Sequence, residues 1–151
     1  MKNFLIALIA VFLFSCGDID NPPVIDVDSE DQKMNEAIKQ AKMSLNQFFE
    51  NYESIDNDGY SLKFGLQTSD GDIEHIWFNP IEVDGDTIKA KCANEPRDIP
   101  GLKLGDIRDL QRDQITDWMI ISGNKCYGCY TIRVLAEKDP SNAPPFEYVD
   151  F

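Results

Sequence analysis

The sequence predicts an α+β fold, in which one N-terminal amphipathic helix packs on a curved antiparallel sheet or small open barrel of about six strands. Two observations lead to this fold class. A helical period of apolar residues precedes residue 55, and short β-rich segments separated by turn residues follow it. Because these strands follow one another as hairpins, we expect an antiparallel sheet with the helix covering one face.

The predicted helix begins near Ser29, which together with Gln32 is typical of a capping box. Apolar residues then recur in alternating steps of four and three, which places them on one face of a helix. They are Met34, Ile38, Ala41, Leu45, Phe48 and Tyr52. The opposite face is acidic or mixed rather than basic, so packing on the sheet is favoured over binding to a membrane surface.

After residue 59 the apolar period changes to two. Residues 60–67 alternate apolar and polar, which predicts a half-buried strand. This strand begins the first of two successive hairpins, and a last hairpin is centred on residues 122–124. The other expected strands are residues 72–78, 81–83, 87–93, 115–121 and 125–135. Residues 107–110 fit a strand or a helix equally, and residues 138–151, which contain three prolines, are expected to be irregular.

The first 15 residues have the pattern of a signal peptide. Lys2 supplies a positive charge, and an apolar run follows at residues 4–14. This run is shorter than the roughly 20 residues that a membrane-spanning helix needs. We therefore expect the segment to be removed and exclude it from the fold.

The residues at the predicted cleavage point resemble the lipobox of bacterial lipoproteins, in which a cysteine becomes the lipidated first residue. They are Leu13-Phe14-Ser15-Cys16. The resemblance implies a membrane-anchored lipoprotein of the bacterial cell envelope, with the membrane as a partner through the lipid on Cys16. The alternative is an ordinary secretory signal with a chance cysteine.

Composition divides the chain into four segments. Residues 1–15 form the signal peptide, residues 16–28 an acidic tether containing two prolines, residues 29–137 one α+β domain, and residues 138–151 the tail. Removal of the 15 signal residues from the 151-residue chain leaves 136 residues, enough for a single hydrophobic core.

The chain is strongly acidic. Its formal net charge is −13, and loss of Lys2 with the signal peptide changes this to −14. Binding to nucleic acid needs clustered Lys and Arg to neutralise phosphates. We therefore expect no nucleic-acid partner.

Two of the cysteines form a Cys-x-x-Cys pair, Cys126 and Cys129, which is a pattern of redox centres and zinc sites. On the predicted strand their Cα atoms would lie about 10 Å apart, whereas a disulfide needs about 7 Å or less. The pair can therefore close only if Gly128 bends the strand. Cys92 is either a small core residue or the partner of one of these thiols.

No familiar catalytic constellation is present in the sequence. His75 is the only histidine, and a lone histidine on a strand is more often a hydrogen-bonded structural residue than a catalyst. A zinc site would need all four candidate ligands, namely His75, Cys92, Cys126 and Cys129. We expect no metal site, no cofactor and no catalytic residues.

Residues 60–135 resemble the bacterial domain-of-unknown-function family 2314. The resemblance rests on an ordered series of short motifs. They are Glu74-His75-Ile76-Trp77, Asn94-Glu95-Pro96, Leu102-Lys103-Leu104-Gly105-Asp106, Ile115-Thr116-Asp117-Trp118-Met119 and Gly128-Cys129-Tyr130-Thr131-Ile132-Arg133. Members of that family tend to have a second glycine at the position of Cys129. The resemblance implies no established activity.

The sequence favours a non-catalytic binding or interaction module for a protein or small ligand. The candidate binding residues are His75, Trp77, Asn94, Asp117, Trp118, Thr131 and Arg133. The hairpin register does not place Asp117 opposite Arg133, so either residue could instead satisfy loop backbone groups. The alternatives are a small enzyme or thiol-redox protein using His75 with Asp117 or the Cys126 and Cys129 thiols, and a structural component of the envelope.

Overall fold

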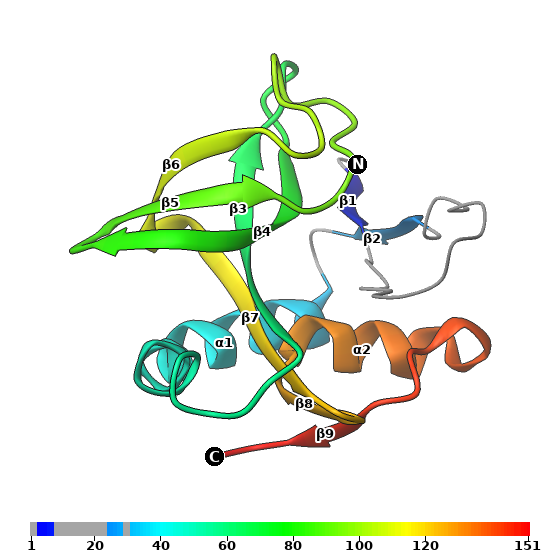
Figure 1. Ribbon diagram of the computed structural model, residues 1–151. Helices are drawn as coiled ribbons and strands as arrows, with labels where there is room; N and C mark the ends of the chain where they lie inside the picture. Colours follow the sequence, from blue (N-terminus) through cyan, green and yellow to red (C-terminus); the bar gives the residue numbers. More distant parts are fainter. Residues whose placement is uncertain (1–2, 8–23, 29–30) are drawn as a thin grey trace, which may run out of the picture.

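The computed structural model describes residues 3–7, 24–28 and 31–151, and these residues have the predicted α+β fold. Helices α1 (Gln32–Asn51) and α2 (Tyr130–Lys138) lie side by side next to one mostly antiparallel sheet (Figure 1). None of the helices in these residues is long and apolar enough to cross a membrane.

Three antiparallel strands form the centre of the sheet. β3 (Gly59–Gln67) lies between β4 (Ile73–Asp84) and β7 (Ile115–Ser122). The second half of β4 leaves β3 and pairs with β5 (Thr87–Cys92), which pairs in turn with β6 (Ile107–Gln111). A register shift in β4 between Pro80 and Glu82 accompanies this change of partner, and it curves the sheet as predicted.

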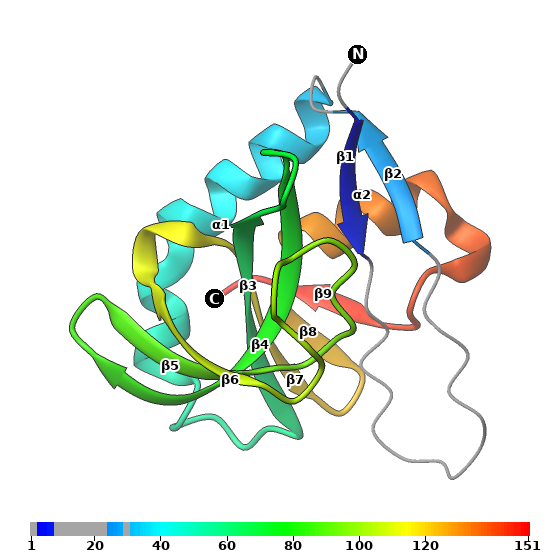
Figure 2. The same cartoon turned by 90° about the horizontal axis from the view of Figure 1, so that it is seen from above.

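Further strands extend the sheet on both sides. β7 pairs with β8 (Lys125–Gly128), which pairs in parallel with β9 (Glu147–Val149). On the other side, β1 (Asn3–Ala7) pairs in parallel with β4, and β2 (Val24–Asp28) pairs with β1 (Figure 2). β1 therefore falls within the predicted signal peptide and β2 within the predicted tether.

Helix α1 follows the predicted apolar period. Its N-cap is Asp31, whose side chain accepts a hydrogen bond from the Met34 N–H (3.1 Å). Ser29, the predicted cap, lies outside the described residues. The buried side chains of α1 are Met34, Ala37, Ala41, Leu45 and Phe48, so the predicted face is the one that packs.

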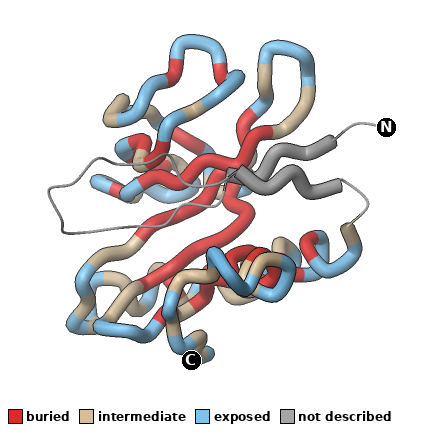
Figure 3. The backbone as a smooth tube through the Cα atoms, turned by 90° about the vertical axis from the view of Figure 1, so that its right-hand side faces the viewer, coloured by how far each residue is buried: buried red, intermediate tan, exposed pale blue. Residues whose placement is uncertain are grey.

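Both faces of the central strands are covered. One hydrophobic cluster contains Phe48 of α1 and Phe64 of β3, and a second contains Trp77 of β4 with Ile132 of α2. The residues along the middle of the sheet are accordingly buried, as the red part of the tube in Figure 3 shows. The prediction that residues 60–67 are half-buried was wrong for the middle of β3, because α2 covers its second face.

Two local predictions near the C-terminus were wrong. The strand expected over residues 125–135 ends at Gly128, where φ is +75°, and Cys129 also has a left-handed φ of +56°. Because a strand cannot continue through this conformation, the chain turns and α2 begins at Tyr130. The tail is not wholly irregular either, since it contains the 3₁₀ helix η2 (Pro140–Asn142) and β9.

The undecided segment at residues 107–110 is a strand, β6, and the short 3₁₀ helix η1 (Arg112–Gln114) connects it to β7.

Candidate functional site

A buried polar network lies where the three central strands meet α2. The sheet register places Lys63 of β3 opposite Trp77 of β4 on one side and opposite Asp117 of β7 on the other. Cross-strand neighbours point to the same face of a sheet. These side chains therefore gather on the face that α2 covers.

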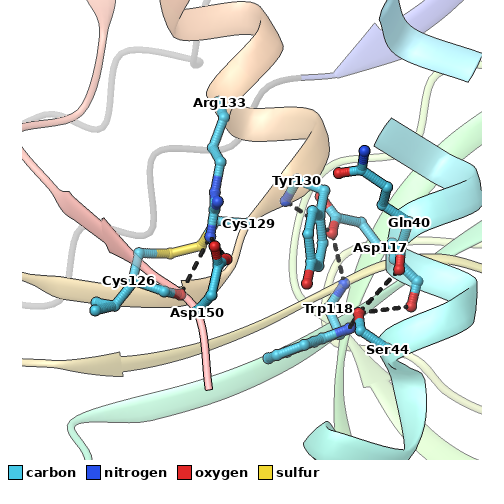
Figure 4. A network of polar contacts seen from close by, with 11 residues as sticks. Gln40, Ser44, Asp117, Trp118, Cys126, Cys129, Tyr130, Arg133 and Asp150 are labelled. Carbon is cyan, nitrogen blue, oxygen red and sulfur yellow. Dashed lines mark hydrogen bonds and ion pairs between the residues drawn. A yellow bond between two sulfur atoms is a disulfide. The ribbon is translucent and has the colours of Figure 1, made fainter. Parts of the chain in front are cut away.

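Asp117 is the centre of this network. Its carboxylate accepts hydrogen bonds from the backbone N–H groups of Trp118 (2.8 Å) and Tyr130 (3.1 Å) (Figure 4). It also accepts hydrogen bonds from the Thr131 N–H (2.8 Å) and the Thr131 hydroxyl (2.5 Å). Tyr130 and Thr131 are the first residues of α2, and the N-cap residue Cys129 provides no side-chain cap. Asp117 therefore caps α2 from a neighbouring strand, and its negative charge interacts favourably with the positive end of the helix dipole.

Lys63 is fully buried beside Asp117. Its ammonium donates to the Thr131 Oγ1 (2.6 Å) and lies 4.7 Å from the centre of the Trp77 ring. Burial lowers the pKa of Lys63 to about 8, against the opposing effect of Asp117. Burial likewise raises the pKa of Asp117, against the opposing effects of Lys63 and the hydrogen-bond donors. The Thr131 hydroxyl thus bridges two buried ionisable groups.

His75 lies on the same face, next to the network. Its Nδ1 is 2.9 Å from the Thr116 hydroxyl, and Thr116 occupies the register shift between β3 and β7. Burial, together with the nearby positive charges of Lys63 and Lys42, lowers the pKa of His75 to about 3. The imidazole is therefore neutral at physiological pH, as expected of a structural histidine.

His75 makes the stability of the fold depend on pH. Its pKa is about 3 in the folded chain and 6.5 in the reference state, so unfolding takes up a proton between these values. We expect His75 to lower the free energy of unfolding by up to about 1.4 kcal/mol for each unit of pH below 6.5. Urea unfolding of the native chain and of His75→Gln at pH 7 and pH 5 measures this. If the free energy of unfolding changed equally in the two proteins between pH 7 and pH 5, the prediction would be contradicted.

The segment after β5 is fastened to β4 by two other motif residues. Asn94 accepts the Trp77 N–H through its Oδ1 (2.8 Å). The Glu74 carboxylate accepts the N–H groups of Arg97 (2.9 Å) and Asp98 (3.0 Å). These side chains therefore satisfy backbone groups that the sheet leaves without a strand partner.

Cys126 and Cys129 form a disulfide, with a Cα–Cα distance of 6.2 Å. The expectation that a strand separates these thiols was wrong, because the left-handed turn at Gly128 brings them together. Cys92 is the free cysteine of the described residues and is buried, so it does not bridge to either. Its Sγ lies 3.1 Å from the Asn94 carbonyl oxygen, and burial raises the pKa of this thiol to about 11.

The disulfide and the buried free thiol of Cys92 predict which cysteines can be alkylated in a Cys16→Ser chain. In the folded protein no thiol should react, since Cys92 is buried and protonated and the other two are bridged. Denaturation without a reductant should expose one reactive thiol, and reduction should raise the number to three. Mass spectrometry counts the alkyl groups, and Cys92→Ser in the same background should give none before reduction. Labelling of more than one thiol without reductant would contradict the disulfide.

Arg133 does not pair with Asp117, and it lies on α2 rather than on the second strand of the predicted hairpin. Its guanidinium donates to the Val149 carbonyl (3.1 Å) and pairs with Asp150 (2.8 Å), so it fastens the C-terminal strand to α2 (Figure 4). Trp118 donates from Nε1 to the Ser44 hydroxyl of α1 (3.0 Å) and is buried in the core. It is therefore a packing anchor.

Comparison with known proteins assigns the fold to a family. The model of DUF2314, described as an uncharacterized protein conserved in bacteria, matches residues 31–143. The chain belongs to the DUF2314 family. The match begins at the N-cap of α1 and includes η2, so the DUF2314 domain is longer than the resemblance at residues 60–135 suggested.

Two curated relatives are similar to the chain. It is 28% identical to the uncharacterized protein YegJ of Escherichia coli K12 over 136 residues, which cover 89% of this chain and 88% of that protein. It is 26% identical over 118 residues to a putative ankyrin repeat protein of Neisseria meningitidis serogroup B, covering 72% of this chain and 47% of that protein. No solved structure matches the chain.

The predicted binding residues do not line an open groove of the DUF2314 domain. Six of the seven are buried, and Arg133, with 25% of its side chain exposed, is partly covered. The buried six are His75, Trp77, Asn94, Asp117, Trp118 and Thr131. Asp117, Thr131 and Trp77 are brought together, whereas Arg133 lies toward the C-terminal strand.

Sequence reasoning missed Lys63, which completes the network, and it quoted Glu74 as a motif residue without counting it among the candidate binding residues. Lys63 lies in the alternating polar positions of β3, which predicted solvent exposure. Knowledge of the register with Asp117 and Trp77 would have been needed to place it inside. Within the described ranges, no three His, Cys, Asp or Glu side chains are arranged to hold a metal ion.

A surface hollow of about 500 Å³ lies elsewhere, between α1, the turn after β4 and η1. It is lined by Lys42, Leu45, Asp86, Gln111, Arg112 and Asp113, and none of the predicted binding residues takes part.

Proposed function

We propose that the protein is a lipoprotein of the bacterial cell envelope, held on the membrane through a lipid on Cys16. Its DUF2314 domain acts as a non-catalytic binding or interaction module for a protein or a small ligand, and not for nucleic acid. The anchoring is supported by the charged and apolar pattern of residues 1–15 and by the lipobox-like residues that end at Cys16.

The non-catalytic role is supported by one observation: the side chains that could act in catalysis are buried and take part in contacts that stabilise the fold. Asp117 caps α2 and accepts four hydrogen bonds. His75 is buried, and its pKa of about 3 makes it a weak base at neutral pH. The Cys126 and Cys129 sulfurs are bridged and buried. An enzyme using these groups would have to break the structure that positions them.

The anchor is tested by fractionating cells that produce the native chain or Cys16→Ser. We expect the native protein in the membrane fraction, with a mass that reports removal of residues 1–15 and addition of acyl chains. Cys16→Ser should lose the lipid and leave the membrane pellet, whereas the matched control Gly17→Ala should behave like the native chain. Equal membrane association of Cys16→Ser and native protein, or a processed chain without lipid, would refute the anchor.

The binding role is separated from the enzymatic alternative with His75→Gln and with the double variant Cys126→Ala and Cys129→Ala. Formaldehyde cross-linking in intact cells, followed by purification, measures the fraction of the lipoprotein held in a complex. An interaction module should keep this fraction in every variant that remains folded. A biological activity lost in a folded His75→Gln or double cysteine variant, with the complex intact, would favour the enzyme.

A further inference from the structure

One edge of the central sheet is occupied by a strand that the proposed processing removes. The first half of β4 pairs with β3 on one side. On its other side β1 runs parallel to it, with Ile6 opposite His75, and β2 follows outside β1 (Figure 2). β1 spans Asn3–Ala7, which lies entirely within the first 15 residues.

The backbone of β4 shows which groups face this edge. The Trp77 N–H donates to Asn94 Oδ1, and the Trp77 carbonyl accepts the Ala93 N–H (2.8 and 2.9 Å), so both point away from β3. Backbone direction alternates along a strand. Ile73 and His75, at steps of two from Trp77, therefore present their N–H and C=O groups to the same edge, and β1 pairs with His75 there.

The neighbouring strand stays with the chain after cleavage. β2 ends at Asp28, close in sequence to Asp31, the N-cap of α1, and it lies beyond Cys16. Removal of β1 would leave a place one strand wide between β2 and β4. Strands are about 4.8 Å apart, so these two edges are separated by about 9.6 Å.

We propose that, in the processed chain, this edge of β4 is the interaction surface and takes an extended, uncharged apolar segment of a partner protein as a parallel strand in the place of β1. The site rests on the proposed removal of residues 1–15. Strand addition to an open edge gives affinity through main-chain hydrogen bonds. The five residues of β1, Asn-Phe-Leu-Ile-Ala, carry no charge and are the kind of segment that the edge accepts in the full chain.

The test uses the processed lipoprotein isolated from membranes in detergent, with amide hydrogen exchange at His75 as the readout. The probe is a synthetic peptide of residues 2–8, lengthened with lysines for solubility. We expect the His75 amide to exchange rapidly without the peptide and at least about tenfold more slowly when the peptide is bound. If β2 instead closes onto β4, the amide is slow without the peptide and indifferent to it, and the proposal is wrong.

Two proline substitutions sharpen the result. Ile73→Pro removes an edge-facing N–H at the first residue of β4, a position where proline is compatible with a strand. It should weaken peptide binding about tenfold. Asp109→Pro is the matched control, because the register of β6 with β5 turns the Asp109 backbone toward the far edge of the sheet. Equal effects of the two variants would overturn the site.

A variant of the peptide serves as the control for peptide binding, and the mass of the isolated protein reports on the processing. With Ile6 opposite His75, the neighbouring Ala7 N–H faces the His75 carbonyl in a parallel pair, so an Ala7→Pro peptide should bind about tenfold more weakly. The mass of the isolated protein shows whether residues 1–15 are absent. A chain that retains them refutes the processing and the site with it, whereas a processed chain that ignores the peptide refutes the site alone.

Discussion

Asp117→Ala is expected to lower the free energy of unfolding by about 3–5 kcal/mol, because it leaves the buried Lys63 ammonium without its counter-charge and removes the cap of α2. Domains of this size are stable by only about 5–15 kcal/mol in total. Urea unfolding followed by tryptophan fluorescence measures the loss. A change below about 1 kcal/mol would show that the network does not hold α2 on the sheet.

A double-mutant cycle separates the charge from the cap. Asp117→Asn keeps an oxygen acceptor and should destabilise less than Asp117→Ala. Lys63→Met removes the ammonium and retains a side chain of similar length. The double variant Lys63→Met with Asp117→Asn buries no charge, so its loss should be smaller than the sum of the single losses by about 1–3 kcal/mol. Additive losses would mean that Lys63 and Asp117 do not interact.

Gly128→Ala is expected to destabilise the fold by about 2–5 kcal/mol. Gly128 has a φ of +75°, which costs a residue with a Cβ about 1–2 kcal/mol. The new Cβ would also collide with the backbone oxygen of Trp118 and with its ring, at 2.7 Å from Cδ2, and overpacking of this kind costs about 1–3 kcal/mol more. Thermal and urea unfolding of the oxidised protein provide the measurement.

Gly123→Ala is the matched control for this prediction. Gly123 also has a positive φ, +61°, but a Cβ there would meet nothing within 4 Å. Its alanine variant should lose only the backbone cost of about 1–2 kcal/mol. If Gly128→Ala and Gly123→Ala lower the free energy of unfolding equally, the close approach of β8 to Trp118 is not the reason for a glycine at position 128.

The motif residues on which the family resemblance rests thus mainly hold one element of the DUF2314 domain against another. Asp117 joins β7 to α2, Glu74 and Asn94 join β4 to the segment after β5, and Gly128 permits the turn from β8 into α2. This explains why they looked like a binding site in the sequence. The polar side chains of these short motifs satisfy buried backbone groups here.

Much of the fold could be predicted because its signals are local. The apolar period of α1 extends over five turns, and the burial of Met34, Ala41 and Phe48 follows it. The hairpins of β3 to β5 are separated by turn residues at short range, so their existence and antiparallel order could be predicted as well.

The candidate site could not be predicted, because its geometry depends on residues that are distant in sequence. Lys63 looks like a solvent-facing strand residue until the register places it beside Trp77 and Asp117 and α2 covers that face. The segment after Cys129 is β-rich in composition, yet it is helical because Asp117 caps its first N–H groups.

The sequence by itself determined the fold class, the position of the first helix, the order of the hairpins and the family. The tertiary structure decided where α2 begins, that Cys126 and Cys129 bridge, and that the motif side chains are interior. The physical reason is that periodicity and turn chemistry act between near neighbours, whereas capping by Asp117 and the charge balance with Lys63 exist only once strands and helix have met.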